Sequence, residues 1–314
     1  MLLSILIPIF NFDITALLES LAVEISSSAL NSKVEVILVD DASTDFKIKE
    51  MNRNIVDRLD NAYIKYFELE KNIGRSSIRN YLGNIATSEY LLCIDSDMLP
   101  DKVDFVQKYL SYAEEGFYDV VCGGRSYLKR RDWDKRFDFY CYFSNKREVI
   151  PDNIRNAEPW RFLFTSNIMV RRRIFLDNMF DESFVGYGYE DVEWGIRLVD
   201  TCKIVHIDNT ASHLGLIGKN ECYTTMVDSI PNLFRLISKH PDYFTKTPIY
   251  HYVLVFSCLP GKLLFFLKSV LFAIFSRTNK FVIAFIAIQL SKAILITLKI
   301  RTNKKSESIS ASRY

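Results

Sequence analysis

Four short, largely apolar segments recur through the first hundred residues: Leu3–Phe10, Val34–Val39, Tyr63–Leu69 and Tyr90–Ile94. Each is too short for an ordinary helix, and such runs favour strands buried in a parallel sheet. Between the first two, the apolar residues from Ile14 to Ile25 follow helical spacing. The alternation predicts an α/β fold of Rossmann-like type, with a mostly parallel sheet and helices on both faces.

Carboxylates follow two of these segments at the predicted carboxyl edge of the sheet. Asp40-Asp41 comes after the second segment, and Asp95-Ser96-Asp97 comes after the fourth. Ligands bind at this edge in open α/β sheets, and carboxylate oxygens suit Mg²⁺ or Mn²⁺, which neutralises a diphosphate. We therefore expect a metal-diphosphate site at Asp95-Ser96-Asp97. Asp132-Trp133-Asp134 has the same spacing without a preceding strand, and we interpret it as a solvated turn.

Composition and motif order argue against several other functions. The 314 residues are 49% hydrophobic and 25% charged, enough for a full core, and a net charge of +2 without a basic helix argues against nucleic-acid binding. No G-x-G-x-x-G follows the first segment, since the first glycine is Gly74, and this disfavours a dinucleotide site. Phosphatases with an Asp-x-Asp nucleophile carry it after the first strand. Here the Asp-x-Asp pair follows the fourth predicted strand, which disfavours that class of enzyme. The six scattered cysteines indicate reduced thiols in a cytosolic protein, and Met1–Pro8 is expected to be a strand, not a signal peptide.

Four motifs in order resemble the nucleotide-sugar half of family 2 glycosyltransferases of the GT-A fold: Ile5–Asn11, Val39–Asp45, Asn72–Asn80 and Asp95-Ser96-Asp97. The resemblance implies a donor site for a UDP-sugar made by Pro8, Phe10, Asp40, Asp41, Asn72, Arg79, Asp95 and Ser96. Asp40 can accept the uracil N3–H, although both acids of that pair could instead cap a turn. Arg75 and Arg79 lie one helical turn apart and either face the diphosphate or pair with the acids of the sheet edge.

A second block, Phe184–Leu198, begins with a glycine-rich turn and places adjacent acids in the first turn of a helix. It resembles the acceptor loop of β-1,4-galactosyltransferases and of bacterial hyaluronan and chondroitin polymerases. The resemblance implies that Tyr187 stacks on the acceptor sugar, that Glu190 binds its hydroxyls and that Asp191 is the general base. The family usually has tryptophan and a small residue where this chain has Tyr187 and Tyr189. Capping by the acids is the structural alternative.

Aromatic residues upstream of this block could also stack on an acceptor or belong to the core; they are Trp133, Tyr140, Tyr142 and Trp160. Histidines follow downstream. In the resembled enzymes a histidine in this region completes the metal shell, which implies His213 as a ligand of Mn²⁺ or Mg²⁺ beside Asp97, with Asp95 acting through water. His206 lies within an apolar strand and is interpreted as a core histidine.

The last seventy or so residues are strongly apolar, in segments Ile249–Leu259, Leu263–Phe275 and Phe281–Ile300. Lysine at position 292 would cost about 2.5 to 3.5 kcal/mol at a bilayer centre, which makes a true span marginal. Lysines along apolar helices fit an in-plane anchor on an anionic leaflet. A buried helical subdomain or the face of a homodimer is the alternative.

Taken together with these residues, the resemblance implies an inverting, metal-dependent glycosyltransferase, with hexosyl or N-acetylhexosaminyl specificity. It would transfer sugar from a UDP-sugar to a glycan or lipid-linked acceptor of a surface polysaccharide, in the cytoplasm at the inner face of the membrane. We expect residues 1–100 to form the donor half and 101–240 the acceptor half of one GT-A domain, with 241–314 as a helical extension. The alternatives are a nucleotidyltransferase and a non-catalytic, membrane-bound partner of another transferase.

Overall fold

The computed structural model describes residues 1–130 and 134–311, with side chains as far as Thr302. The predictions for Asp132 and Trp133 therefore lie outside the described residues. The chain divides into two compact units. The first comprises Met1–Trp133, Ser144–Val185 and Glu190–Leu216, and the second comprises Asp134–Phe143, Gly186–Tyr189 and Ile217–Tyr314.

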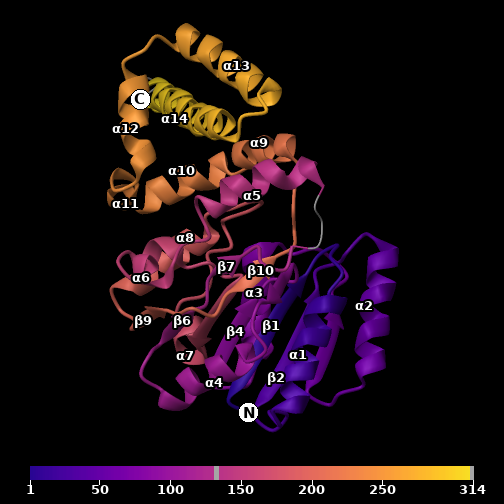
Figure 1. The fold of residues 1–314 in the computed structure, drawn as a ribbon. Helices are drawn as coiled ribbons and strands as arrows, with labels where there is room; N and C mark the ends of the chain where they lie inside the picture. Colours follow the sequence, from indigo (N-terminus) through magenta and orange to yellow (C-terminus); the bar gives the residue numbers. More distant parts are fainter. Residues whose placement is uncertain (131–133, 312–314) are drawn as a thin grey trace. The chain divides into compact units, whose positions relative to one another are not determined.

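Within the described residues, the first unit is built on a seven-stranded sheet of order β3-β2-β1-β4-β8-β6-β9 (Figure 1). Its strands are β1 (Leu3–Ile9), β2 (Val34–Asp40), β3 (Ile64–Glu68), β4 (Tyr90–Ile94), β6 (Val120–Cys122), β8 (Asn167–Arg171) and β9 (Ile204–His206). The first four run parallel to one another, β8 lies antiparallel between β4 and β6, and β9 runs parallel to β6. The prediction of a mostly parallel sheet is confirmed.

Helices of the first unit connect these strands. They are α1 (Thr15–Ser27), α2 (Phe46–Leu59), α3 (Arg75–Ile85), α4 (Phe105–Glu115), α6 (Asp152–Arg155), α7 (Arg172–Asp177), α8 (Glu190–Val199) and the 3₁₀ turn η2 (Pro159–Phe162). Carboxylates accept hydrogen bonds at the starts of two of these helices. The Asp45 carboxylate accepts hydrogen bonds from the first turn of α2, and the Asp13 carboxylate accepts one from the backbone N–H of Thr15.

Alternation along each strand produces two cores, one on each face of the sheet. Ile5 and Ile7 of β1 join a cluster with α1 and α4, whereas Leu6 joins a cluster with α3, α7 and α8. Both faces are thus covered by helices, as predicted. In the second cluster Trp194 of α8 stacks on Phe180 with ring centroids 4.7 Å apart, which anchors α8 against the sheet.

A smaller sheet of three described strands lies at the exit of β4: β5 (Met98–Pro100), β10 (Ala211–His213) and β7 (Arg125–Ser126), with β10 in the middle. β10 pairs antiparallel with β5, opposite Met98 at His213. This pairing joins the loop after β4 to a segment more than a hundred residues later in the chain.

The second unit is helical in its described part. It contains η1 (Lys135–Phe137), most of α5 (Asp138–Asn145), α9 (Lys219–Asp228), α10 (Ile230–Lys239), α11 (Pro241–Thr245), α12 (Pro248–Ser257), α13 (Gly261–Arg277) and α14 (Phe281–Ala311). Aromatic contacts hold α5 against α13, since the rings of Phe139 and Phe275 meet edge to face at 5.3 Å. The three apolar segments of the C-terminus correspond to α12, α13 and α14, so they are helices, as expected.

Candidate active site

The loop after β4 carries Asp97 next to His213 of β10. The His213 Nε2 atom lies 3.0 Å from the Asp97 Oδ2 atom, although the residues are 116 positions apart. Burial alone would raise the pKa of Asp97, but the His213 imidazole, aided by Arg125 and Arg75, lowers this pKa to about 2. Asp97 is therefore a permanent anion at neutral pH.

The donor set of this pair fits a divalent cation. The Oδ1 atom of Asp97 is buried and has no hydrogen-bond partner, and an unsatisfied carboxylate oxygen is costly unless a ligand completes it. Imidazole and carboxylate both suit Mn²⁺. Among the described residues, no group of three or more His, Cys, Asp or Glu side chains is arranged so that it could hold a metal ion by itself. A cation here would thus need further ligands, such as diphosphate oxygens and water.

Asp95 has a different partner from Asp97. Its Oδ1 atom accepts a hydrogen bond of 2.8 Å from the Nη2 atom of Arg79 on α3. Arg79 is 5% exposed, and its Nη1 atom lies 3.5 Å from the Glu190 carboxylate. Burial lowers the pKa of Arg79, but Asp95 and Glu190 together hold it above its ordinary value. Of the two arrangements considered for Arg79, pairing with acids is the one observed, and it ties the exit of β4 to the start of α8.

Asp191 occupies the first turn of α8, next to the buried Glu190. Burial, followed by the charge of Glu190, raises the pKa of Asp191 to about 7, against smaller opposing effects of Arg125 and Arg79. A carboxylate whose pKa lies near the working pH can take a proton from a hydroxyl and release it again. One of its oxygens also accepts the N–H of Val192 at 2.8 Å, so a capping interaction is present as well.

The acids after β2 have distinct partners. Asp40 is buried; its Oδ1 atom accepts the N–H of Ser43 at 2.6 Å, and its Oδ2 atom has no hydrogen-bond partner. That open acceptor is what the predicted contact with a base N–H requires. Both oxygens of Asp41 instead accept the backbone N–H groups of Ile73 and Gly74, at 2.7 and 3.0 Å. Asp41 therefore orders the loop that precedes α3.

The other predicted donor residues surround this edge in different ways. Phe10 follows β1 and is 50% exposed, while Pro8 and Ser96 are partly buried. The Asn72 side chain donates to the carbonyl of Asp41 at 2.9 Å, so it supports the same loop.

The predicted acceptor residues belong to both units. Trp160 of η2 is partly buried. Its backbone carbonyl packs closely on α8, since a Cβ added to Gly195 would lie only 2.8 Å from the carbonyl oxygen. Tyr187 belongs to the second unit and is 43% exposed. His206 is buried between the Arg155 Nη1 atom at 2.9 Å and the Pro159 carbonyl at 3.2 Å. Its interpretation as a core histidine is confirmed.

Arg125 of β7 is the functional candidate that sequence reasoning missed. Its Nε atom donates to the Ser166 hydroxyl at 2.7 Å, and its Nη1 atom donates to Glu148 at 2.9 Å. Its charge lowers the pKa of both Asp97 and Asp191. The available signal was an arginine directly after the apolar run and glycine pair at 120–124, at another strand exit.

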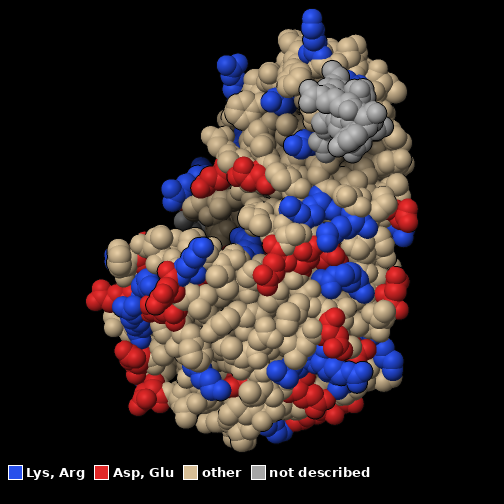
Figure 2. Space-filling model, turned by 180° about the vertical axis from the view of Figure 1, so that it is seen from behind, with Lys and Arg blue, Asp and Glu red and all other residues tan. Residues whose placement is uncertain are grey.

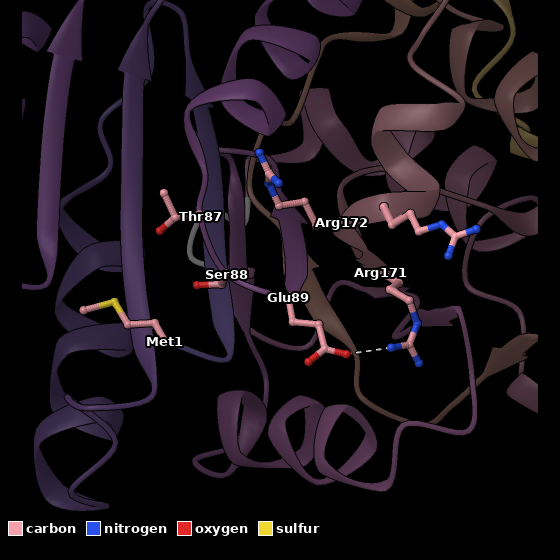
Figure 3. A pocket seen from close by; sticks show the side chains of 7 residues that line it. Met1, Thr87, Ser88, Glu89, Arg171 and Arg172 are labelled. Carbon is pink, nitrogen blue, oxygen red and sulfur yellow. Dashed lines mark hydrogen bonds and ion pairs between the residues drawn. The ribbon is translucent and has the colours of Figure 1, made fainter.

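A cavity of about 590 Å³ lies at the opposite edge of the sheet, where β1 and β4 begin (Figure 3). It is lined by Met1, Thr87, Ser88, Glu89, Arg171, Arg172 and Arg173. Arg171 donates to Glu89 at 2.6 Å, and Arg172 donates to the Ala86 carbonyl at 2.8 Å. Arg171 and Arg172 thus bind the segment that leads into β4. None of the predicted site residues lines the cavity.

Comparisons with known proteins agree with this geometry. Residues 4–177 match the model of the family "Glycosyl transferase family 2". The uncharacterized glycosyltransferase YfnE of Bacillus subtilis (strain 168) is 27% identical over 240 residues, which cover 62% of this chain and 59% of the relative. The chain thus spans less than two thirds of the length of that relative.

Solved structures show the same fold. Residues 1–349 of S. aureus TarS align with a TM-score of 0.51 at 19% identity, covering 96% of this chain and 92% of that one. The mannosyltransferase PcManGT of Pyrobaculum calidifontis, solved with GDP-Man and Mn²⁺, aligns with a TM-score of 0.56 at 14% identity, covering 95% and 86%. The predicted GT-A architecture with an apolar helical extension is thereby confirmed. Since the family model covers more than half of the residues, this chain belongs to glycosyl transferase family 2.

Proposed function

We propose that this protein is an inverting, metal-dependent glycosyltransferase that transfers a hexosyl or N-acetylhexosaminyl group from a UDP-sugar to a glycan or lipid-linked acceptor. One observation carries the proposal: Asp97 lies 3.0 Å from His213, and Arg79 joins Asp95 of the same loop to Glu190, the residue before Asp191, so the candidate cation ligands and the candidate base are linked. Leaving-group stabilisation and deprotonation of the acceptor are the two requirements of a single displacement at an anomeric carbon.

The residues take complementary roles in this mechanism. Asp97 and His213 would hold Mn²⁺ or Mg²⁺, which neutralises charge on the leaving diphosphate. Asp191 accepts the proton of the attacking acceptor hydroxyl, and Glu190 would bind neighbouring hydroxyls. Arg79 fixes Asp95 and Glu190 through its two ion pairs. Asp40 would accept the N3–H of uracil through its open oxygen.

The ligands present in solved structural neighbours support the choice of substrate class. TarS 1–349 has been solved with UDP and with UDP-GlcNAc, and PcManGT with GDP-Man and Mn²⁺. The Tyr187 segment supports a sugar acceptor, since an exposed aromatic ring can stack on the C–H face of a pyranose.

We further propose that α12 and α13 rest on the inner face of a membrane. Large apolar side chains are exposed along both helices, among them Val255, Phe265 and Phe266 at 65%, 58% and 63%. Apart from the buried Lys292, the sequence between Tyr243 and Thr302 has seven Lys or Arg and no Asp or Glu. The upper part of the face in Figure 2, where the C-terminal helices lie, is mostly tan with scattered blue side chains. Apolar contact with basic neighbours matches an anionic lipid surface.

A membrane span is the less favoured arrangement. Among the described residues, one helix is long and apolar enough to cross a bilayer, Phe281–Thr302 of α14, with a mean hydropathy of 2.2. Half of that window is buried inside the protein, as in a core helix. Lys292 in its middle is also buried, at 7% exposure, and bonds to protein groups.

A donor screen tests the proposed function. The full chain is incubated with individual UDP-sugars and GDP-mannose, with Mn²⁺, Mg²⁺ or EDTA, and nucleoside diphosphate release is measured. We expect release from at least one UDP-sugar, dependent on the added cation. No diphosphate release from any sugar nucleotide, or release that EDTA does not diminish, would contradict the proposal.

A further inference from the structure

The loop Gly186–Tyr189 has an unusual backbone. Gly186 and Gly188 adopt φ values of +85° and +84°, which glycine permits, but Tyr189 adopts φ +73°. A bulky residue is rarely found in this region, because its Cβ crowds its own backbone. Such a conformation persists only where surrounding contacts enforce it.

The contacts that enforce it come from the second unit. The Nζ atom of Lys292 on α14 donates a hydrogen bond to the Tyr189 hydroxyl. Asn232 of α10 donates to the Tyr187 carbonyl at 3.4 Å, and a Cβ added to Gly188 would lie 3.6 Å from the Cβ of Ser229. Two helices from the C-terminal part of the chain, α10 and α14, therefore hydrogen-bond to the loop at Tyr187 and Tyr189, and Ser229 just before α10 lies beside Gly188.

Lys292 itself requires a polar partner. It is 7% exposed and stands among buried apolar neighbours of α14, including Ile288, Ala293 and Ile296. An ammonium group removed from water is strongly destabilising unless hydrogen bonds replace its hydration. The ammonium lies 5.1 Å from the centroid of the Tyr189 ring, at the hydroxyl end, because it bonds the hydroxyl. The interaction thus depends on the oxygen of Tyr189.

The position of the loop in the chain gives these contacts a functional meaning. Val185 before it and Glu190 after it both belong to the first unit, while the loop belongs to the second. The residue that Lys292 holds is followed at once by Glu190 and Asp191. A change in the backbone of Tyr189 would be transmitted to the first turn of α8 and to Tyr187.

We propose that Lys292 is a positioning residue for acceptor use, which sets the conformation of Gly186–Tyr189 through the Tyr189 hydroxyl. The inference rests on the proposed glycosyltransferase function and assigns α14 a role in it. It also accounts for a lysine in the middle of an apolar helix, since that lysine serves a protein contact and not a lipid surface.

Three substitutions in the full chain test the inference. Lys292→Met keeps an unbranched side chain of similar length and removes the donor, and Tyr189→Phe removes only the hydroxyl. Lys299→Met is the matched control, because Lys299 lies on the same helix and is exposed. Acceptor KM and kcat, UDP affinity, melting temperature and amide hydrogen exchange of the loop are measured for each variant.

We expect Lys292→Met and Tyr189→Phe each to lower kcat/KM for the acceptor by about tenfold to a hundredfold, as for loss of a charge-assisted hydrogen bond. UDP affinity should be retained, and amides of Gly188, Tyr189 and Glu190 should exchange faster. The double variant should be no worse than the more affected single variant, because both remove the same contact. The Lys299→Met protein should match the wild type.

Equal acceptor kinetics and equal loop exchange in the Lys292→Met and Lys299→Met proteins would overturn the inference. If Lys292→Met fails to fold, Tyr189→Phe decides by the same two measurements. A wild-type protein that turns over no sugar nucleotide would refute the proposed function alone, and the exchange experiment would still decide whether Lys292 sets the loop.

Discussion

Replacing Asp191 with asparagine separates the proposed chemistry of this residue from its structural role. Asparagine is nearly isosteric, and its amide oxygen can still accept the Val192 N–H that Asp191 accepts at 2.8 Å. What is lost is the proton acceptor. A positioned general base contributes about a hundredfold to ten-thousandfold to a rate, so kcat should fall by at least about a hundredfold.

The same substitution should stabilise the protein, and the direction follows from the pKa. Burial and Glu190 raise the pKa of Asp191 from 3.8 to about 7 in the folded state. The folded protein then binds this proton more tightly than the unfolded chain, so this group lowers stability progressively as the pH rises from about 4 to about 7. Above pH 7 the full penalty applies. At about 1.4 kcal/mol for each pKa unit, its upper limit is about 4 kcal/mol, reduced by the partial exposure of the side chain.

Steady-state kinetics and urea unfolding of both proteins at pH 5 and pH 8 measure the two effects. The Asp191→Asn protein should be nearly inactive at both pH values and more stable than the wild type at pH 8, with a smaller difference at pH 5. Wild-type kcat should rise with pH to a plateau above about pH 7. Near-normal turnover would remove Asp191 from the mechanism, and lower stability of the variant at pH 8 would refute the assigned environment.

Glu190→Gln is the matched comparison, because it alters the adjacent acid. Its proposed contribution is hydrogen bonding to acceptor hydroxyls in the ground and transition states alike, so acceptor KM should rise more than kcat falls. Glutamine also removes the charge that raises the pKa of Asp191. The kcat of the Glu190→Gln protein should therefore reach its plateau at a lower pH than the kcat of the wild type. An unchanged pH profile would contradict the coupling of the two acids.

Asp97→Ala should abolish the Mn²⁺ dependence of UDP binding in calorimetry, while Asp134→Ala, which alters an exposed capping residue, should not. Gly215→Ala should weaken Mn²⁺-dependent UDP binding without unfolding the protein, because its Cβ would stand 2.4 Å from Asp97 Oδ2; unchanged metal affinity would show that the Asp97–His213 pair tolerates displacement. Phe266→Asp should weaken sedimentation with anionic vesicles about tenfold or more, as burial of a phenylalanine ring is worth about 1.5 to 3 kcal/mol, whereas Phe46→Asp on α2 should have no effect.

Local patterns were sufficient for most of the framework. Short, largely apolar runs and acids at strand exits are encoded in neighbouring residues, so β1, β2 and β4, and the acids that follow β2 and β4, could be predicted. The start of α8 at Glu190 followed from its glycine-rich turn. The approach of Asp97 to His213 required the resemblance to a family, because 116 residues separate them.

The missed features depend on tertiary contacts that leave no periodic signal. β5, β7 and β10 have two or three residues each, too few for a recognisable pattern, and they bring Arg125 near the acids. The pairing of Asp41 with the backbone of Ile73 and Gly74 is likewise a long-range contact. The sequence pattern around Lys292 indicates either a costly charge in a bilayer or a lysine of an in-plane anchor, whereas the structure pairs this lysine with the hydroxyl of Tyr189.

Nuclear magnetic resonance of donor breakdown tests the central proposal most directly. A UDP-sugar selected in the donor screen is incubated with the full chain and Mg²⁺, and phosphorus and proton spectra are recorded from the first minutes. The proposed mechanism predicts UDP together with a free sugar whose first-formed anomer is inverted relative to the donor, and neither product in the Asp97→Ala protein. Release of UMP with sugar 1-phosphate, or a first-formed anomer that retains the donor configuration, would contradict an inverting glycosyltransferase.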